Sequence, residues 1–422
     1  MEVAKNIRFS GLRETFKAER LINKTKGDKV IWALVIILSL VSVLAVYSAT
    51  GSLAYKNYQG NTEYYLFKQF AFVIGGILII YFAHLVNYRY YSNIAKLLFG
   101  VSIVLLAYTL FFGVTMNEGS RWLRLPHTSL TFQTSDFAKL ALFMYLARLL
   151  SKKQNVIKDF KKGFLPVIIP VLLTCLLIAP ANLSTAMLLG ASCMLLLFIG
   201  RARLKHIAVT VGILSIPVAI LVSVALMRSN KQNENGVAAA TSGSVLMGRV
   251  DTWMNRIESF FNGDNEDNDT YQINQSKIAI ANGGTIGLGP GNSITRDYLP
   301  QAYNDFIYAI IIEEYGLLGG AFIMFIYLVF LYRCIRIFKR CPFAFGAFLA
   351  LGLSFTLAIQ AVANMAVTVG VLPVTGVTLP LVSMGGTSII FTCLAIGIIL
   401  SVARNVEQME SAAAPAVENE GA

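Results

Sequence analysis

Charged side chains are scarce in this sequence of 422 residues. They make up 14% of the chain, whereas hydrophobic residues make up 56% and the mean hydropathy is +0.63. A soluble domain carries roughly a quarter charged residues, so this composition cannot cover the water-facing surface of a soluble enzyme of this size. The apolar content also excludes a disordered chain, and no short repeat recurs to support a fibrous one. The composition therefore indicates a membrane protein.

Long apolar runs recur from one end of the chain to the other. A helix needs about 20 apolar residues to cross a hydrocarbon core of roughly 30 Å, and it satisfies its own backbone hydrogen bonds there. We therefore expect an all-α integral membrane protein with about ten transmembrane helices. The expected spans are 30–49, 69–86, 94–113, 136–150, 164–180, 182–200, 206–227, 306–332, 343–366 and 381–403.

Basic residues are distributed unevenly between alternate loops. Of the 35 lysine and arginine residues, 24 fall in the two tails and the loops on one side, and 10 fall on the other side. Cytoplasmic loops carry the basic excess in membrane proteins, so both termini are predicted to be cytoplasmic. This placement accounts for the net charge of +12 without a nucleic acid partner. The predicted parts are a cytoplasmic tail 1–29, a polytopic domain 30–404 with a large outer loop 228–304 between helices 7 and 8, and a disordered tail 405–422.

Cysteine and histidine are also rare. The five cysteines lie inside expected spans or at the cytoplasmic edge, so no disulfide framework is predicted outside the cell. Their spacing matches no zinc or haem pattern, and the three histidines are isolated from one another and from any cysteine pair. The sequence therefore indicates neither a zinc site nor a haem site.

The outer segment 228–304 is long for a protein whose other connections are short. Such loops are usually functional or disordered. Its acidic stretch 264–269 lacks the glycine and the glutamate of a calcium loop. The run 282–293 holds five glycines within nine residues, which suits either a nest of backbone N–H groups for an anion or a set of tight turns. It lacks the Gly-Lys-Ser/Thr of a nucleotide P-loop.

Asp305 is the last acidic residue before the apolar run 306–312. It is therefore expected at the outer membrane surface, near the start of a helix. One interpretation is a helix N-cap, which would contribute about 1 kcal/mol. The other is a carboxylate between an aqueous site and lipid, placed to act as a general base on a lipid-linked substrate. The residues alone leave both interpretations open.

Two pairs of ionisable residues fall deep inside expected spans, where such groups are costly and often functional. Asp136 and Lys139 are three residues apart and share one helix face. Glu313 and Glu314 lie more than one turn into the eighth helix. These groups must face a polar cavity or one another, so a substrate cavity and a structural ion-pair cluster both fit the sequence.

Two further segments are predicted on the outer side. Arg121 stands beside Trp122, a pair that can hold an anion or serve as an ordinary aromatic anchor at the interface. The segment 370–388 is apolar, contains prolines and glycines, and includes a stretch too short to span. It fits a re-entrant loop that lines a cavity or a surface for helix packing.

Taken in order, these segments resemble the SEDS family of bacterial cell-wall proteins, named for shape, elongation, division and sporulation. The resemblance covers about 30–404, and its pieces are weak singly but specific together. The matching pieces are Tyr47-Ser48-Ala49, Gly119-Ser120-Arg121-Trp122, Gln133-Thr134-Ser135-Asp136 with Lys139, Tyr271-Gln272 with Gln275, the glycine run to Ser293, Leu299-Pro300, Asn304-Asp305-Phe306, Glu313-Glu314 and Gly385-Gly386-Thr387-Ser388.

The resemblance implies a peptidoglycan glycosyltransferase that polymerises lipid II at the outer face of the bacterial cytoplasmic membrane. It implies inversion at the donor sugar, a lipid pyrophosphate leaving group and Asp305 as the catalytic base. The implied partners are lipid II, the nascent glycan strand, the lipid bilayer and a class B penicillin-binding protein. The resemblance leaves open a divalent cation, Mg²⁺ or Mn²⁺, and implies no other cofactor. The residues that it places at the substrate are Arg121, Trp122, Asp136, Lys139, Arg249, Arg256, Gln272, Gln275, Glu313, Ser383 and Ser388.

The chain departs from the family pattern at some positions. Asp136 stands where the family has glutamate, and Asn182 replaces an acid at the corner between the fifth and sixth helices. The piece Thr378-Leu379-Pro380 and the basic N-terminal tail favour a division-type member, located at the septum with other division proteins. The alternatives are an elongation-type polymerase, a lipid II flippase and a non-enzymatic division scaffold.

Overall fold

The structure is a computed structural model that forms a bundle of helices. It describes residues 27–51, 53, 63–116, 119–124, 131–235, 253–254 and 268–418. Each of the ten expected spans overlaps one helix. These helices are α2 (Lys29–Ala49), α4 (Glu63–Leu85), α5 (Tyr88–Phe112), α6 (Thr134–Lys153), α7 (Leu165–Ile178), α8 (Leu183–Ile199), α9 (Leu204–Asn235), α12 (Ile307–Arg340), α13 (Ala344–Thr368) and α14 (Thr387–Glu418).

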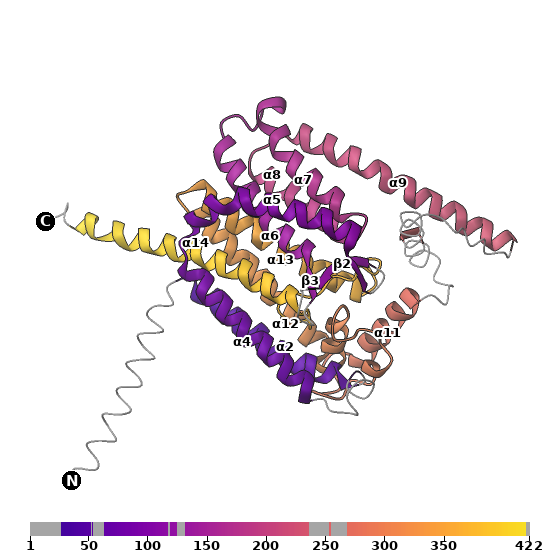
Figure 1. The fold of residues 1–422 in the computed structure, drawn as a ribbon. Coiled ribbons are helices and arrows are strands. Elements are labelled where there is room, and N and C mark those ends of the chain that lie inside the picture. Colours follow the sequence, from indigo (N-terminus) through magenta and orange to yellow (C-terminus); the bar gives the residue numbers. More distant parts are fainter. Residues whose placement is uncertain are drawn as a thin grey trace, which may run out of the picture.

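Length and composition qualify seven helices in the described residues as membrane spans, which makes this a multi-pass membrane protein. α8 and the first part of α9 are shorter apolar helices, and α6 carries the charges of Asp136, Lys139 and Arg148. The expected number of ten spans therefore stays a prediction. Figure 1 shows α9 and the end of α14 reaching out from the bundle.

Short elements that the sequence did not predict lie between these helices. A π-helical turn, Phe160–Phe164, leads into α7, and a single 3-10 turn, Thr295–Asp297, follows the glycine run. α11 (Asn268–Gly283) lies within the segment predicted to be an outer loop. A three-stranded antiparallel sheet precedes α6, and its strands are β1 (Val114–Met116), β2 (Gly119–Arg124) and β3 (Thr131–Gln133).

The core of the bundle is α13, 78% of whose best apolar window is buried inside the protein. Small residues let neighbouring helices approach closely, as is usual in membranes. A Cβ at Gly352 of α13 would lie 2.7 Å from the Phe143 ring of α6. A Cβ at Gly76 of α4 would lie 2.6 Å from Cys393 Sγ of α14. The first contact packs α6 against the buried helix α13, which carries side chains of the candidate site, and the second packs α4 against α14.

The ends of three helices are joined near the first described residues by an ion pair and hydrogen bonds. The Asp28 carboxylate caps α2 by accepting from Val30 N, and it lies 2.6 Å from Nη2 of Arg333 in α12. The Gly27 N–H donates to the Glu407 carboxylate of α14 at 2.8 Å. α14 continues into the segment 405–422 as far as Glu418, and the disorder expected for this tail stays a prediction. Of the predicted tail 1–29, the described residues begin at Gly27.

The glycine run packs its backbone against a break in α12. Gly316 has φ +71° and ψ −176°, a conformation that only glycine adopts readily. At this break the glycine run lies directly against α12. Leu288 N donates to Glu313 O and Leu317 N donates to Gly284 O, both at 2.9 Å. The expected set of tight turns is therefore present, and α12 supports it.

We predict that Gly316→Ala lowers stability by about 3 kcal/mol, because strain at positive φ adds to overpacking. A Cβ at Gly316 would lie 2.3 Å from Thr285 O. Gly284→Ala is the matched control, since Gly284 has φ +50° but nothing within 4 Å of an added Cβ, and it should cost about 1 kcal/mol. Thermal unfolding of the two purified variants in detergent checks the difference. Equal melting temperatures would contradict the role given to the break.

Candidate active site

Asp305 lies in the tight turn that leads from the outer segment into α12. The turn is closed by Asn304 N and Asp305 N, which donate to Gln301 O at 2.9 and 3.3 Å, and Gln301 has φ +55°. The N-cap residue of α12 is Phe306, which makes no side-chain cap. The N-cap interpretation of Asp305 is therefore wrong. Its half-buried carboxylate lies one residue outside the helix, at the border between the outer segment and the span.

Burial also affects the tyrosine beside this turn. Desolvation raises the pKa of Tyr303 above its usual value, and the charges of Tyr65 and Asp305 raise it further. Tyr303 therefore stays a neutral phenol at physiological pH. A neutral phenol is a poor proton acceptor, so Tyr303 is not the candidate base of the turn.

A loop between α13 and α14, residues 370–386, lies directly against the Asp305 turn. Met384 N in this loop donates to Tyr303 O at 3.0 Å. From α13, the Asn364 side-chain amide donates to Asp305 O at 2.7 Å and to Val377 O at 2.8 Å. The segment has little helix and is supported by the side chains of neighbouring helices, as a re-entrant loop would be.

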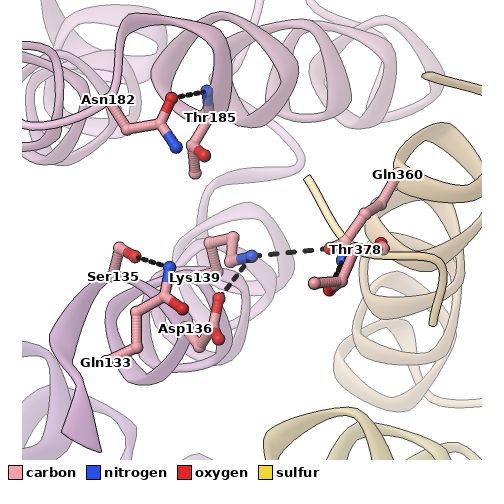
Figure 2. Close-up of polar contacts among 8 residues, drawn as sticks. All are labelled: Gln133, Ser135, Asp136, Lys139, Asn182, Thr185, Gln360 and Thr378. Carbon is pink, nitrogen blue, oxygen red and sulfur yellow. Dashed lines mark hydrogen bonds and ion pairs between the residues drawn. The ribbon is translucent and has the colours of Figure 1, made fainter. Parts of the chain in front are cut away.

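Asp136 and Lys139 form an ion pair of 2.7 Å on α6, and their side chains are 6% and 15% exposed. They lie in the first turns of α6, immediately after β3, so the small sheet sets their position. Lys139 Nζ also lies 3.5 Å from Gln360 Oε1 of α13, whose amide donates to Thr378 O at 2.9 Å (Figure 2). The pair is therefore connected to the 370–386 loop through a single α13 side chain.

Two cavities meet at Lys139 and Gln360. One opens between α6, α13 and α14, and the other lies between α6, α8 and α13. The first is lined by Asp136 and Ser388 together with apolar side chains such as Leu140. Asp136 Oδ2 has no hydrogen-bond partner among the described residues. The sequence left a cavity and an ion-pair cluster as alternatives, and the structure contains both at the same place.

Glu313 is fully buried, and its carboxylate holds the glycine run. It accepts hydrogen bonds from Ser293 Oγ, from Asn282 Nδ2 at 3.3 Å, and from Thr295 N and Oγ1, the latter at 2.7 Å. Glu314 accepts from Ser48 Oγ of α2. The anion that the glycine run receives is therefore a carboxylate of the protein itself, and the assignment of Glu313 to the substrate finds no support in these contacts.

The other predicted site residues are spread over several elements. Ser383 is buried, and its hydroxyl accepts from Leu379 N at 2.8 Å within the 370–386 loop. Gln272 and Gln275 are half-buried on α11, which is fastened to α13 by a bond from Ser276 Oγ to Thr368 O. Arg121 and the half-buried Trp122 lie on β2. Arg249 and Arg256 lie outside the described residues.

The described residues include no group of three or more histidine, cysteine, aspartate or glutamate side chains that could hold a metal ion. The divalent cation that the resemblance leaves open stays a prediction. Asn182, at the corner where the family has an acid, caps α8 by accepting from Thr185 N at 3.1 Å (Figure 2). Its amide therefore has a local role at the helix start.

Sequence reasoning missed Gln360 and Asn364. Both are uncharged polar residues inside a long apolar run, and each donates to a backbone carbonyl of the 370–386 loop. Their spacing of four residues, which puts them on one face of α13, was the signal available in the sequence. Gln360 faces Lys139 and Asn364 faces the Asp305 turn, so one helical turn separates the two parts of the candidate site.

Comparisons with known proteins place this arrangement in a family. A model of the family described as cell cycle protein, which covers FtsW, RodA and SpoVE, matches residues 28–408. Stage V sporulation protein E of Bacillus subtilis is 32% identical over 90% of this chain and 98% of its own. A probable peptidoglycan glycosyltransferase FtsW of Geobacter sulfurreducens is 33% identical over 90% of this chain and 96% of its own.

Solved structures show the same fold. A chain from a structure titled for the coordination of polymerization and crosslinking by a peptidoglycan synthase complex aligns with a TM-score of 0.70 and 23% identity, over 90% of this chain and 99% of that one. The rod shape determining protein RodA of Thermus thermophilus aligns with a TM-score of 0.60 and 22% identity, over 90% and 97%. With its motifs, its fold and nearly its whole length in agreement with these proteins, the chain belongs to the FtsW, RodA and SpoVE family of cell cycle proteins.

Proposed function

We propose that the protein is a peptidoglycan glycosyltransferase that polymerises lipid II at the outer face of the bacterial cytoplasmic membrane during cell division. Family membership and relatives named as probable peptidoglycan glycosyltransferases support the activity. One observation carries it for this chain. The Asp305 carboxylate is half-buried at the outer border of a span, in a turn that α13 and the 370–386 loop hold by its backbone.

Asp305 acts as the general base in this proposal. It takes the proton from the acceptor sugar hydroxyl, and the oxygen attacks the anomeric carbon of the donor from the face opposite the leaving group. The bond from that carbon to the lipid pyrophosphate breaks, and the pyrophosphate leaves with the electron pair. The donor configuration is therefore inverted. A carboxylate between water and lipid suits this step, because its partial burial favours proton transfer and the substrate lipid stays in the membrane.

The cavity beside Lys139 is the proposed place for part of the lipid-linked substrate. Its lining combines apolar side chains with the Asp136–Lys139 pair and Ser388, which matches a ligand with an apolar chain and an anionic group. A lysine ammonium neutralises developing charge on a pyrophosphate. Arg121, on the sheet that leads into α6, is the second proposed cation, with Trp122 as an interfacial contact.

The proposed partners are a class B penicillin-binding protein that crosslinks the new strand and other division proteins at the septum. A structural neighbour whose title names a peptidoglycan synthase complex supports the first of these. A lipid II flippase and an elongation-type polymerase are the competing functions. Polymerisation assayed in detergent separates a polymerase from a flippase, because detergent micelles have no second leaflet.

We predict that Asp305→Asn lowers the rate of glycan polymerisation by about 10²-fold or more, because the amide cannot accept the hydroxyl proton. The purified protein with its penicillin-binding partner, given lipid II in detergent, supplies the rate through the length and yield of glycan strands. Asp297→Asn is the matched control, since Asp297 is an exposed acid of the same outer segment. Polymerisation by Asp305→Asn at the wild-type rate would remove Asp305 from the mechanism.

We predict that Lys139→Met costs about 3 to 5 kcal/mol of stability, because it leaves the Asp136 carboxylate buried without its partner. The double variant Asp136→Asn with Lys139→Met should recover most of that stability, since no buried charge remains. Its polymerisation should stay impaired, because the proposed cation is gone. Thermal unfolding and the lipid II assay measure the two effects. A stable double variant with full activity would make the pair purely structural.

A further inference from the structure

Asn364 is a buried amide in the middle of the most buried helix. Its side chain is 1% exposed, and α13 around it is largely apolar. Both hydrogens of the amide are used outside the helix, one on Asp305 O at 2.7 Å and one on Val377 O at 2.8 Å. A polar group at this depth is costly. Its two donor bonds connect the turn that carries Asp305 with the 370–386 loop.

The loop that shares this amide is itself held firmly by other helices. Gln360 donates to Thr378 O, and Tyr327 of α12 donates to Pro380 O. Ser42 of α2 donates to Val382 O at 2.8 Å. Three helices thus bind consecutive parts of the loop through its carbonyl oxygens, which leaves the loop a rigid support. A second bond, from Met384 N to Tyr303 O, fastens the Asp305 turn to the same support.

We propose that Asn364 is a positioning residue that sets where the Asp305 carboxylate lies, by fixing the backbone of Asp305 onto the 370–386 loop. The inference rests on the proposed function of Asp305 as the base. Asp305 precedes the N-cap of α12, so the helix does not fix its backbone through capping. A displacement of about 1 Å at a reacting group can reduce a rate by about 10²-fold. The Asn364 amide holds this backbone directly, by its hydrogen bond to Asp305 O.

The test compares Asn364→Ala with Tyr327→Phe in the purified complex with the penicillin-binding partner, using lipid II in detergent. Both variants remove a buried side-chain donor to a carbonyl of the loop, but Tyr327 makes no hydrogen bond to the Asp305 turn. For Asn364→Ala we expect kcat to fall by about 10-fold to 10²-fold with KM unchanged, because Asp305 acts in the transition state. The acidic limb of the kcat–pH profile should also move. For Tyr327→Phe we expect a similar fall in melting temperature, with kcat within about twofold of wild type.

Each outcome decides a separate point. An inactive Asp305→Asn together with an unchanged kcat in Asn364→Ala overturns the positioning role and leaves the proposed function standing. An active Asp305→Asn overturns the proposed function first. Equal losses of kcat in Asn364→Ala and Tyr327→Phe would assign the effect to the loop as a whole and overturn the role of Asn364. If Asn364→Ala does not fold, Asn364→Gln keeps both donors one methylene further out, and an unchanged kcat and pH profile in that variant overturns the inference equally.

Discussion

The structure depends on one constraint, which is that backbone N–H and C=O groups inside a membrane must find partners within the protein. Helices meet this constraint without help. Among the described residues, the glycine run and the 370–386 loop are two of the stretches that do not form regular helix. Each is supported by side chains from the helices around it, and the turn that carries Asp305 lies against one of them. The costly departures from helix are therefore concentrated at the candidate site.

The two stretches are supported by opposite kinds of group. The glycine run and the residues just after it present N–H and hydroxyl donors, which donate to the Glu313 carboxylate of α12. The 370–386 loop presents carbonyl oxygens, which accept hydrogen bonds from the side-chain amides of Gln360 and Asn364 in α13. A buried carboxylate is tolerable in the first case because several donors converge on Glu313. The 370–386 loop needs no charged residue for its support. Its supporting residues are uncharged amides, so they do not stand out in the sequence as buried charges do.

The sequence predicted helices well and contacts poorly, for physical reasons. An apolar run long enough to span a bilayer satisfies its backbone hydrogen bonds as a helix, so each of the ten expected ranges overlaps a helix. The ion pair of Asp136 and Lys139 was also foreseeable, because spacing alone puts the two on one face. The roles of Glu313 and Asn364 were not, since their partners at Thr295 and Val377 are fixed by how the chain returns on itself. Composition predicted disorder after 405, whereas Glu407 and Glu410 of α14 contact Gly27 N and Arg340.

The separation of Asp305 from Lys139 follows from what the two groups would have to do. A base must reach a sugar hydroxyl that comes from water, whereas a cation for a lipid pyrophosphate must meet it where the lipid enters the bilayer. In the proposed function the two groups act on different parts of the substrate, and a rigid element must then keep their distance fixed. α13 meets this requirement because Gln360 and Asn364, one turn apart on a buried helix, contact one group each. A chain with few charges can build such a site, provided that uncharged amides fix the positions of the charged groups.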